Sequence, residues 1–267
     1  MKEVKLLLTD LDDTLLTDEK QITKRTLKAF ADLKKSGILT GIATARSEIP
    51  AAPYVSALKP EVLILNSGGL VIVNGKTVSK TLLNGKVTAQ VLSLVCREDS
   101  VMDICAETED GYYCNQKDIF KFGADYSHAK FHDFIKPFEK EIYKLTIHSK
   151  SPENLQAITE QFPECRFFCY AASGWCCIQP EGVCKGKGAE IAAAHLGIPF
   201  SRVAAFGDDI TDLELLRDAG CGVAMANAIP VIEKAARYHT GSNEEDGVAQ
   251  FIEDYILIRD EKDGLAG

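Results

Sequence analysis

The chain has 267 residues, of which 46% are hydrophobic and 26% are charged, as is usual for a globular protein with one large domain or two smaller ones. Its formal charge of -9 argues against a surface for nucleic acid or anionic membranes, because both require clustered Lys and Arg. No apolar stretch approaches the length of a membrane span, so we expect a cytoplasmic protein that binds neither nucleic acid nor membrane.

The nine cysteines lie without the paired spacing of a zinc site or the density of a secreted disulfide scaffold. We therefore expect them to be reduced thiols. Cys176 and Cys177 fall in an apolar, strand-like run, where a free cysteine acts as a small buried hydrophobe. A metal or redox role is the alternative.

The first predicted element is an apolar strand over residues 6–8, which is followed by Asp10, Asp12 and Asp13. A continuous aliphatic run between polar residues is typical of a strand buried on both faces of a parallel sheet. Ligands of open α/β sheets bind at the carboxyl ends of the strands, so the position of these acids favours chemistry. The alternative is that Asp10, Asp12 and Thr14 only shape a turn.

An amphipathic helix follows, with Thr23 as a plausible N-cap and Gly37 just beyond its end. The next buried strand ends in Thr44 and Arg46. A βαβ crossover implies that this strand runs parallel to the first one. We therefore expect Thr44 to lie near Asp10.

A helix over residues 51–58 and a strand over residues 62–66 lead into a loop that begins at Asn66, and Asn74-Gly75 marks a hairpin turn. This alternation of strands and helices is typical of a doubly wound parallel sheet. We therefore predict a Rossmann-like α/β core.

The alternation loosens over residues 83–182, where helices over residues 87–95 and 152–162 accompany antiparallel strands. This pattern indicates an α+β unit. We interpret it as an inserted domain, so that residues 1–82 and 183–267 together form the core.

The doubly wound pattern resumes with a helix whose first turn carries Lys185. The strand after it ends before Asp208, and the following helix carries Asp212. Two alternatives remain open here. Lys187, two positions along the same helix, competes with Lys185, and Asp208 and Asp209 could instead cap the following helix.

Four carboxylates from distant parts of the chain could thus face one crevice: Asp10, Asp12, Asp208 and Asp212. Like charges crowded together raise one another's pKa unless a cation neutralises them. Mg²⁺ supplies this cation, because it binds carboxylate oxygens together with waters and typically a substrate phosphate. The sequence therefore predicts a magnesium site.

Four segments in this order resemble the motifs of the haloacid dehalogenase superfamily of phosphatases, specifically its Cof-type branch, which has a large α/β cap inserted before the lysine motif. The motif positions are matched in chain order by Asp10, Asp12, Thr14, Thr44, Lys185, Gly207, Asp208 and Asp212. The segments VAMANA and EEDGVAQFIE also look like this branch. The resemblance covers nearly the whole predicted core.

The resemblance implies a two-step phosphoryl transfer, in which Asp10 attacks phosphorus and water later hydrolyses the aspartyl-phosphate. Asp12 would serve as the general acid and then as the general base. Thr44 and Lys185 would hold the transferring oxygens.

The resemblance also implies that Mg²⁺ binds Asp10, the backbone carbonyl of Asp12, and Asp208. Asp212 would be either a direct ligand or an outer contact. The positions that the family places around the substrate are matched by Thr44, Arg46, Asn66 and Lys185.

We therefore expect a Mg²⁺-dependent phosphatase of small phosphorylated metabolites, such as sugar phosphates or phosphorylated cofactors. Residues 83–182 would form the cap that sets specificity for this small phosphate ester. The alternatives are a phosphomutase on the same scaffold and a non-catalytic, phospholigand-binding regulatory protein. The sequence indicates neither the physiological substrate nor the oligomeric state.

Overall fold

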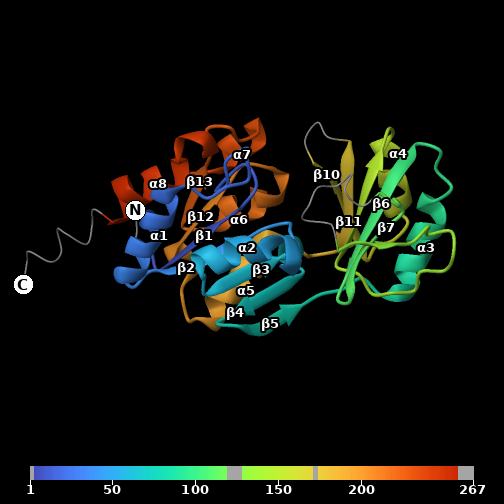
Figure 1. Ribbon diagram of the computed structural model, residues 1–267, viewed down its shortest axis with the longest axis horizontal. Coiled ribbons are helices and arrows are strands. Elements are labelled where there is room, and N and C mark those ends of the chain that lie inside the picture. The colour runs from blue at the N-terminus through green and yellow to red at the C-terminus, as the bar shows by residue number, and fades with distance from the viewer. Residues whose placement is uncertain (1–2, 119–127, 171–173, 258–267) are drawn as a thin grey trace, which may run out of the picture. The chain divides into compact units, whose positions relative to one another are not determined.

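The computed structural model describes residues 3–118, 128–170 and 174–257 (Figure 1). The chain divides into two compact units. The first, called the core unit here, comprises Met1–Ser79 and Cys184–Gly267, and the second, called the inserted unit, comprises Lys80–Val183.

The core unit is built on an eight-stranded sheet with the strand order β14-β13-β12-β1-β2-β3-β4-β5. Its strands are β1 (Leu6–Thr9), β2 (Leu39–Ala43), β3 (Val62–Leu65), β4 (Leu70–Val73), β5 (Lys76–Lys80), β12 (Val203–Gly207), β13 (Cys221–Ala224) and β14 (Tyr238–His239). Neighbours from β14 to β3 run parallel, and β4 pairs with β3 in the antiparallel sense. The predicted α/β class with a parallel-rich sheet is confirmed.

Helices cover both faces of this sheet, as its fully buried central strands require (Figure 1). The helices of the core unit are α1 (Lys24–Lys35), α2 (Glu48–Leu58), α5 (Lys185–His195), α6 (Leu213–Asp218), α7 (Pro230–Ala235) and α8 (Gly247–Phe251). Side chains of α5, α6 and α7 pack with Leu6, Leu8 and Ala205 on one face. Phe206, the next residue of β12, points to the other face and contacts Phe251 of α8.

Short helical turns complete the core unit. They are Asn66–Gly68, Phe200–Arg202, Ile210–Asp212, Asn243–Glu245 and the π-helical Ile252–Leu257. The last of these continues α8 up to Leu257, the last described residue.

Local sequence signals account for the boundaries of several elements. The Oγ1 atom of Thr23 accepts a hydrogen bond from the Thr26 amide and caps α1 as predicted. Gly37, with φ of 73°, ends the same helix in the left-handed region. Asn74 and Gly75 have φ of 49° and 74°, which is the conformation of a two-residue hairpin turn between β4 and β5.

The inserted unit contains a six-stranded sheet in the order β10-β11-β9-β6-β7-β8. Its elements are α3 (Gly85–Val95), β6 (Val101–Thr108), β7 (Gly111–Cys114), β8 (Lys130–Phe131), β9 (Lys144–Ser149), α4 (Pro152–Thr159), β10 (Cys165–Cys169) and β11 (Trp175–Pro180). The pairs are antiparallel except β7 with β8. Apolar residues of α3 and α4 pack with Ile104, Ile147 and Ile178 on one face of this sheet.

The expectation that every cysteine is a reduced thiol is wrong, because Cys169 and Cys176 form a disulfide. The two residues lie directly opposite each other on β10 and β11, with their Cα atoms 3.9 Å apart. Their spacing along the chain does not reveal this strand register. Cys177 is free and fully buried, as expected of a small hydrophobe, and burial raises the pKa of its thiol to about 12.

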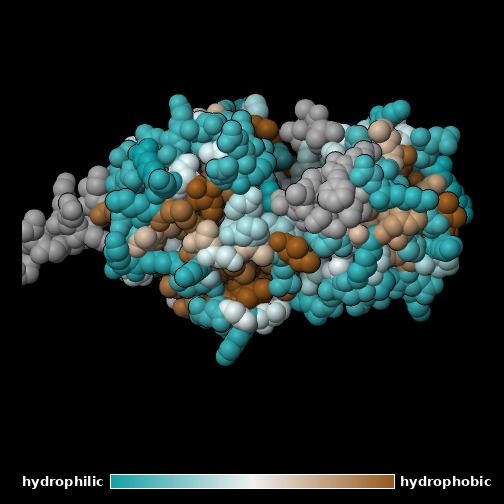
Figure 2. Space-filling view, in the orientation of Figure 1, coloured by the Kyte–Doolittle hydropathy of each residue, from teal (hydrophilic) through white to brown (hydrophobic). Residues whose placement is uncertain are grey.

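On the face drawn in Figure 2, the visible surface of both units is mainly hydrophilic and is interrupted by separate hydrophobic patches. Among the described residues, no helix has the length and apolar character needed to cross a membrane.

The packing of β13 generates a stability prediction. Gly222 lies so close to α6 that an added Cβ would stand 1.9 Å from the backbone oxygen of Leu216. We expect Gly222→Ala to lower the free energy of unfolding by about 3 kcal/mol, measured by chemical denaturation. The control is Gly197→Ala, where nothing lies within 4 Å and only the φ of 68° is unfavourable, so that a loss of about 1 kcal/mol is expected. Equal losses for the two variants would contradict the prediction.

Candidate active site

The strand order brings the predicted site residues to one edge of the core sheet. β1 lies between β12 and β2 and is parallel to both. Asp10, Asp208 and Thr44 directly follow these three strands, so they lie side by side at the carboxyl edge. Ligands bind at this edge in open α/β sheets.

Three buried carboxylates form a compact cluster at this edge. One oxygen from each of Asp10, Asp208 and Asp212 lies within 4.8 Å of the others. Oxygen donors of this kind suit a hard divalent cation such as Mg²⁺, so the residues present fit the predicted ion. The carboxylate of Asp12, also predicted near the metal, is not part of this cluster.

Lys185 contacts two of these carboxylates and is fully buried. Its Nζ atom lies 2.7 Å from Oδ2 of Asp10 and 2.8 Å from Oδ1 of Asp212. By contrast, Lys187 is exposed and pairs with Glu190 on the outside of the helix. Of the two competing lysines, Lys185 is the one that contacts the carboxylates.

The position of Lys185 depends on close packing of α5. Lys185 is the first residue of this helix, and the next turn contains Gly186 and Gly188. An added Cβ at Gly186 would meet the backbone of Leu215 at 2.9 Å, and one at Gly188 would meet Ile64 at 2.7 Å. The absence of side chains at these two positions lets the start of α5 approach the sheet edge.

Asp212 has hydrogen-bond partners on both carboxylate oxygens. Besides Lys185 on Oδ1, Oδ2 accepts hydrogen bonds from the amides of Asp208 and Asp209. An added Cβ at Gly207 would stand 2.4 Å from Cγ of Asp212, so only glycine leaves room for this carboxylate. Asp212 therefore connects the lysine to the loop that carries Asp208.

Thr14 and Asp209 form contacts that help to position the loop after β12. The hydroxyl of Thr14 donates a 2.5 Å hydrogen bond to Oδ1 of Asp208 and so orients this carboxylate. Asp209 accepts a hydrogen bond from the Ile210 amide and caps the following turn, which is the capping role that the sequence allowed for it. The match of Thr14 to a family motif was the only sequence signal for its contact.

Burial controls the ionisation of the cluster in the metal-free protein. Desolvation, together with the neighbouring Asp212, raises the pKa of Asp10 to about 7 in spite of Lys185. Desolvation and the same neighbour raise the pKa of Asp208 to about 8. For Lys185, burial opposes the charged form, but Asp10 and Asp212 outweigh it and raise its pKa. The cluster thus has more acidic groups than one lysine can neutralise.

Asp12 lies apart from the cluster and forms an ion pair with Arg46. The Nε and Nη2 atoms of Arg46 donate to the two carboxylate oxygens at 2.8 and 2.9 Å, and Lys20 lies 3.2 Å away. Partial burial opposes ionisation of Asp12, but the hydrogen bonds and charge of Arg46 outweigh it and lower its pKa. Arg46, predicted to bind substrate, thus contacts Asp12, the predicted acid-base residue.

Thr44 and Asn66 lie on neighbouring turns. Oγ1 of Thr44 accepts a hydrogen bond from the Arg46 amide, and the carbonyl of Arg46 accepts one from the Asn66 amide. Asn66 and Ser67 have φ of 51° and 55°, and their buried Oδ1 and Oγ atoms have no hydrogen-bond partner among the described residues. The structure therefore places Asn66 beside the Thr44 turn but gives its side-chain oxygen no role.

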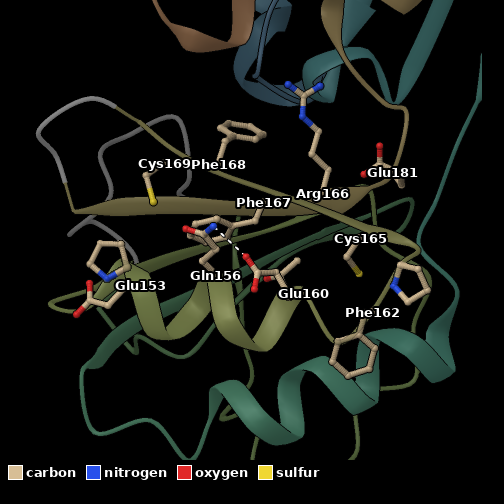
Figure 3. A pocket seen from close by; sticks show the side chains of 13 residues that line it. Glu153, Gln156, Glu160, Phe162, Cys165, Arg166, Phe167, Phe168, Cys169 and Glu181 are labelled. Atoms are coloured by element: carbon tan, nitrogen blue, oxygen red, sulfur yellow. Dashed lines mark hydrogen bonds between the residues drawn. The ribbon is translucent and has the colours of Figure 1, made fainter.

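A cavity of 730 Å³ lies elsewhere, in the inserted unit between α4 and β10 (Figure 3). None of the predicted site residues lines it. Its lining includes Glu153, Glu160, Phe162, Arg166 and Phe167.

Comparison with known proteins places most of the chain in one family. Residues 7–252 match the family model of the haloacid dehalogenase-like hydrolases. The chain is 30% identical to the 5-amino-6-(5-phospho-D-ribitylamino)uracil phosphatase YitU of Bacillus subtilis (strain 168), over 95% of this chain and 98% of that protein. It is 26% identical to the phosphatase YbjI of Escherichia coli (strain K12), which carries the same substrate name, over 94% of this chain and 95% of that one.

Solved structures agree in fold. The HAD subclass IIB sugar phosphatase BT4131 superposes with a TM-score of 0.83 at 22% identity, covering 94% of this chain and 99% of that one. The phosphatase BT1666 of Bacteroides thetaiotaomicron gives 0.81 at 22% identity, covering 94% of both chains. The resemblance seen in the sequence motifs is confirmed: the chain belongs to the haloacid dehalogenase-like hydrolases and is a Cof-type phosphatase of that family.

Proposed function

We propose that this phosphatase hydrolyses small phosphate monoesters with Mg²⁺ and forms an aspartyl-phosphate on Asp10. The observation that carries the proposal is the contact of Lys185 with Asp10 inside a cluster of three buried carboxylates. The lysine charge favours the ionised form of Asp10, which is the nucleophilic form, while burial limits competition from bulk water.

In the first step, an oxygen of Asp10 forms a bond to phosphorus as the bond to the ester oxygen breaks. The ammonium of Lys185 and the hydroxyl of Thr44 hold the phosphoryl oxygens, whose negative charge they stabilise. In the second step, water attacks the phosphorus, inorganic phosphate leaves and the Asp10 carboxylate is restored.

Asp10, Asp208 and the backbone carbonyl of Asp12 would hold Mg²⁺, which supplies positive charge to the crowded carboxylates and to the phosphoryl group. Asp212 would act as an outer contact rather than a ligand. The support for this is that both of its oxygens already accept hydrogen bonds, from Lys185 and from the amides of Asp208 and Asp209.

Asp12 would donate a proton to the leaving oxygen and later take one from the attacking water. Its ion pair with Arg46 suits the second of these tasks, because it keeps the carboxylate ionised. The first task requires Asp12 to leave Arg46 and bind a proton. We therefore propose that Asp12 exchanges between Arg46 and the substrate during turnover.

For the substrate, we propose a phosphorylated polyol or sugar. The support comes from the relatives, since several are named as phosphatases of 5-amino-6-(5-phospho-D-ribitylamino)uracil and one neighbouring structure is a sugar phosphatase. Phosphate release from a panel of such compounds would rank them. Return of the phosphoryl group to the sugar, without phosphate release, would instead indicate a phosphomutase.

The nucleophile can be tested with an aryl phosphate. We expect Mg²⁺-dependent release of the phenol by the unmodified protein, loss of that activity in EDTA, and a fall of about three orders of magnitude or more in kcat for Asp10→Asn. Asp13→Asn is the matched control, because the Asp13 side chain is exposed and forms an ion pair with Lys20 on the surface. Equal activity of Asp10→Asn and the unmodified protein would rule out the proposed mechanism.

The buried lysine can be tested against its exposed neighbour. Lys185→Met should abolish turnover and lower the free energy of unfolding by about 3 kcal/mol, because it leaves Asp10 and Asp212 buried without their cation. Lys187→Met should change neither property by a comparable amount, since this side chain is largely exposed. Activity assays and denaturant titrations of the two variants measure both effects, and a larger loss for Lys187→Met would contradict the assignment.

The raised pKa values of Asp10 and Asp208 predict pH-dependent stabilisation by Mg²⁺. Because the folded state holds these protons more tightly than the unfolded state, the metal-free protein should lose stability as the pH rises from about 4 towards about 8. Mg²⁺ would offset the charges that form, so its addition should raise Tm more at pH about 8 than at pH about 5.5. The Asp208→Asn variant should show a smaller difference, and an equal Tm shift at both pH values would argue against a metal at this cluster.

A further inference from the structure

The edge strand β10 of the inserted sheet leads to a second inference. β10 is the terminal strand of this sheet, and within the described part of the chain no strand pairs with its outer side. Unpaired edges are templates for further strands, and proteins commonly protect them with Lys, Pro or a bulge. The sequence of β10, CRFFC, contains no Pro and a single charged residue, Arg166, and its register with β11 is continuous.

The hydrogen bonds that flank β10 establish which of its backbone groups face outward. The amide of Glu181 donates to the carbonyl of Glu164, and the amide of Tyr170 donates to the carbonyl of Trp175. In an antiparallel pair, every second residue bonds to the partner strand. Even-numbered residues of β10 therefore bond to β11, whereas Phe167 directs its N–H and C=O away from it.

The 730 Å³ cavity lies between this strand and α4, so that a helix and a sheet edge form its two sides (Figure 3). Every residue of β10 lines it. A groove between a helix and an edge strand is the geometry in which an extended peptide adds a strand to a sheet.

The groove has a distinct chemistry on its helical side. Glu153 and Glu160 lie at the two ends of α4 and are exposed, with Gln156 between them donating a hydrogen bond to Glu160. Figure 3 shows the Arg166 side chain extending from the strand on the side away from α4. Phe162 contributes apolar surface and is half-buried. The side of the groove formed by α4 is therefore acidic, with apolar surface from Phe162 next to it.

We propose that this groove binds an extended segment of another protein, which pairs with β10 as an added strand and places Lys or Arg side chains against Glu153 and Glu160. The backbone of Phe167 supplies a donor and an acceptor for the added strand. Because side chains of a strand alternate between its two faces, basic residues are required at every second position. The intervening residues lie on the face of Phe168 and Arg166, so apolar side chains suit these positions and basic ones do not.

A second copy of this chain fits the groove less well. Pairing of two β10 strands about a two-fold axis would bring the two α4 helices next to each other, because each helix flanks its own strand. Glu153 and Glu160 of both copies would then face the same interface, and like charges there are unfavourable. The acidic helix thus favours a basic partner over self-association.

The test uses the full-length protein and a fluorescein-labelled synthetic peptide in which Lys and Val alternate, with fluorescence anisotropy as the readout. We expect saturable binding that weakens with added salt, and affinity at least about tenfold lower for a peptide in which Glu replaces Lys. The Glu153→Gln, Glu160→Gln double variant should reduce this preference. Equal binding of the two peptides, or none, would overturn the proposal.

Strand addition is tested separately from charge. Phe167→Pro removes the outward N–H, whereas the matched variant Phe167→Val keeps it, so Phe167→Pro should bind the Lys-Val peptide about three- to tenfold more weakly than Phe167→Val. The same peptide with alternate backbone nitrogens methylated should also bind more weakly, and this comparison needs no change in the protein. Equal affinities in both comparisons would refute strand addition.

The peptide-free protein tests the other occupant. If it dimerises and Phe167→Pro abolishes the dimer, a second copy of the chain occupies the groove and the proposal is overturned.

Discussion

The fully buried ammonium of Lys185 is the constraint on which the rest of the core unit depends. A buried charge is tolerated only when paired and hydrogen-bonded, and Lys185 has partners from two other segments, Asp10 after β1 and Asp212 before α6. Asp212 in turn accepts hydrogen bonds from backbone amides of the loop that carries Asp208. One side chain thereby fixes three chain segments, which must all be in place before the site exists.

The arrangement of the core could be predicted because its signals are local. Apolar runs bounded by polar residues located β1 and β2, and the parallel crossover rule predicted that Thr44 lies near Asp10. The match to the family motif also favoured Lys185 over Lys187. These inferences require only the order of elements, not the conformation of any side chain.

The features that escaped prediction depend on register or side-chain direction. The disulfide between Cys169 and Cys176 requires that two strands pair with these residues opposite each other, which their spacing does not determine. The ion pair of Arg46 with Asp12 depends on how two side chains turn after their strands end. The contacts of Asn66 are equally unpredictable, because three successive residues there have positive φ.

The inserted unit enters the chain between β5 and α5, and the described residues that build the carboxylate cluster all belong to the core unit. The segment between these two elements can therefore change in length or sequence without altering the contacts of Lys185. In evolutionary terms, the chemistry and the insert form separable modules. Descendants of one ancestor can exchange or remodel the insert, and so acquire new binding properties, while inheriting the reaction unchanged.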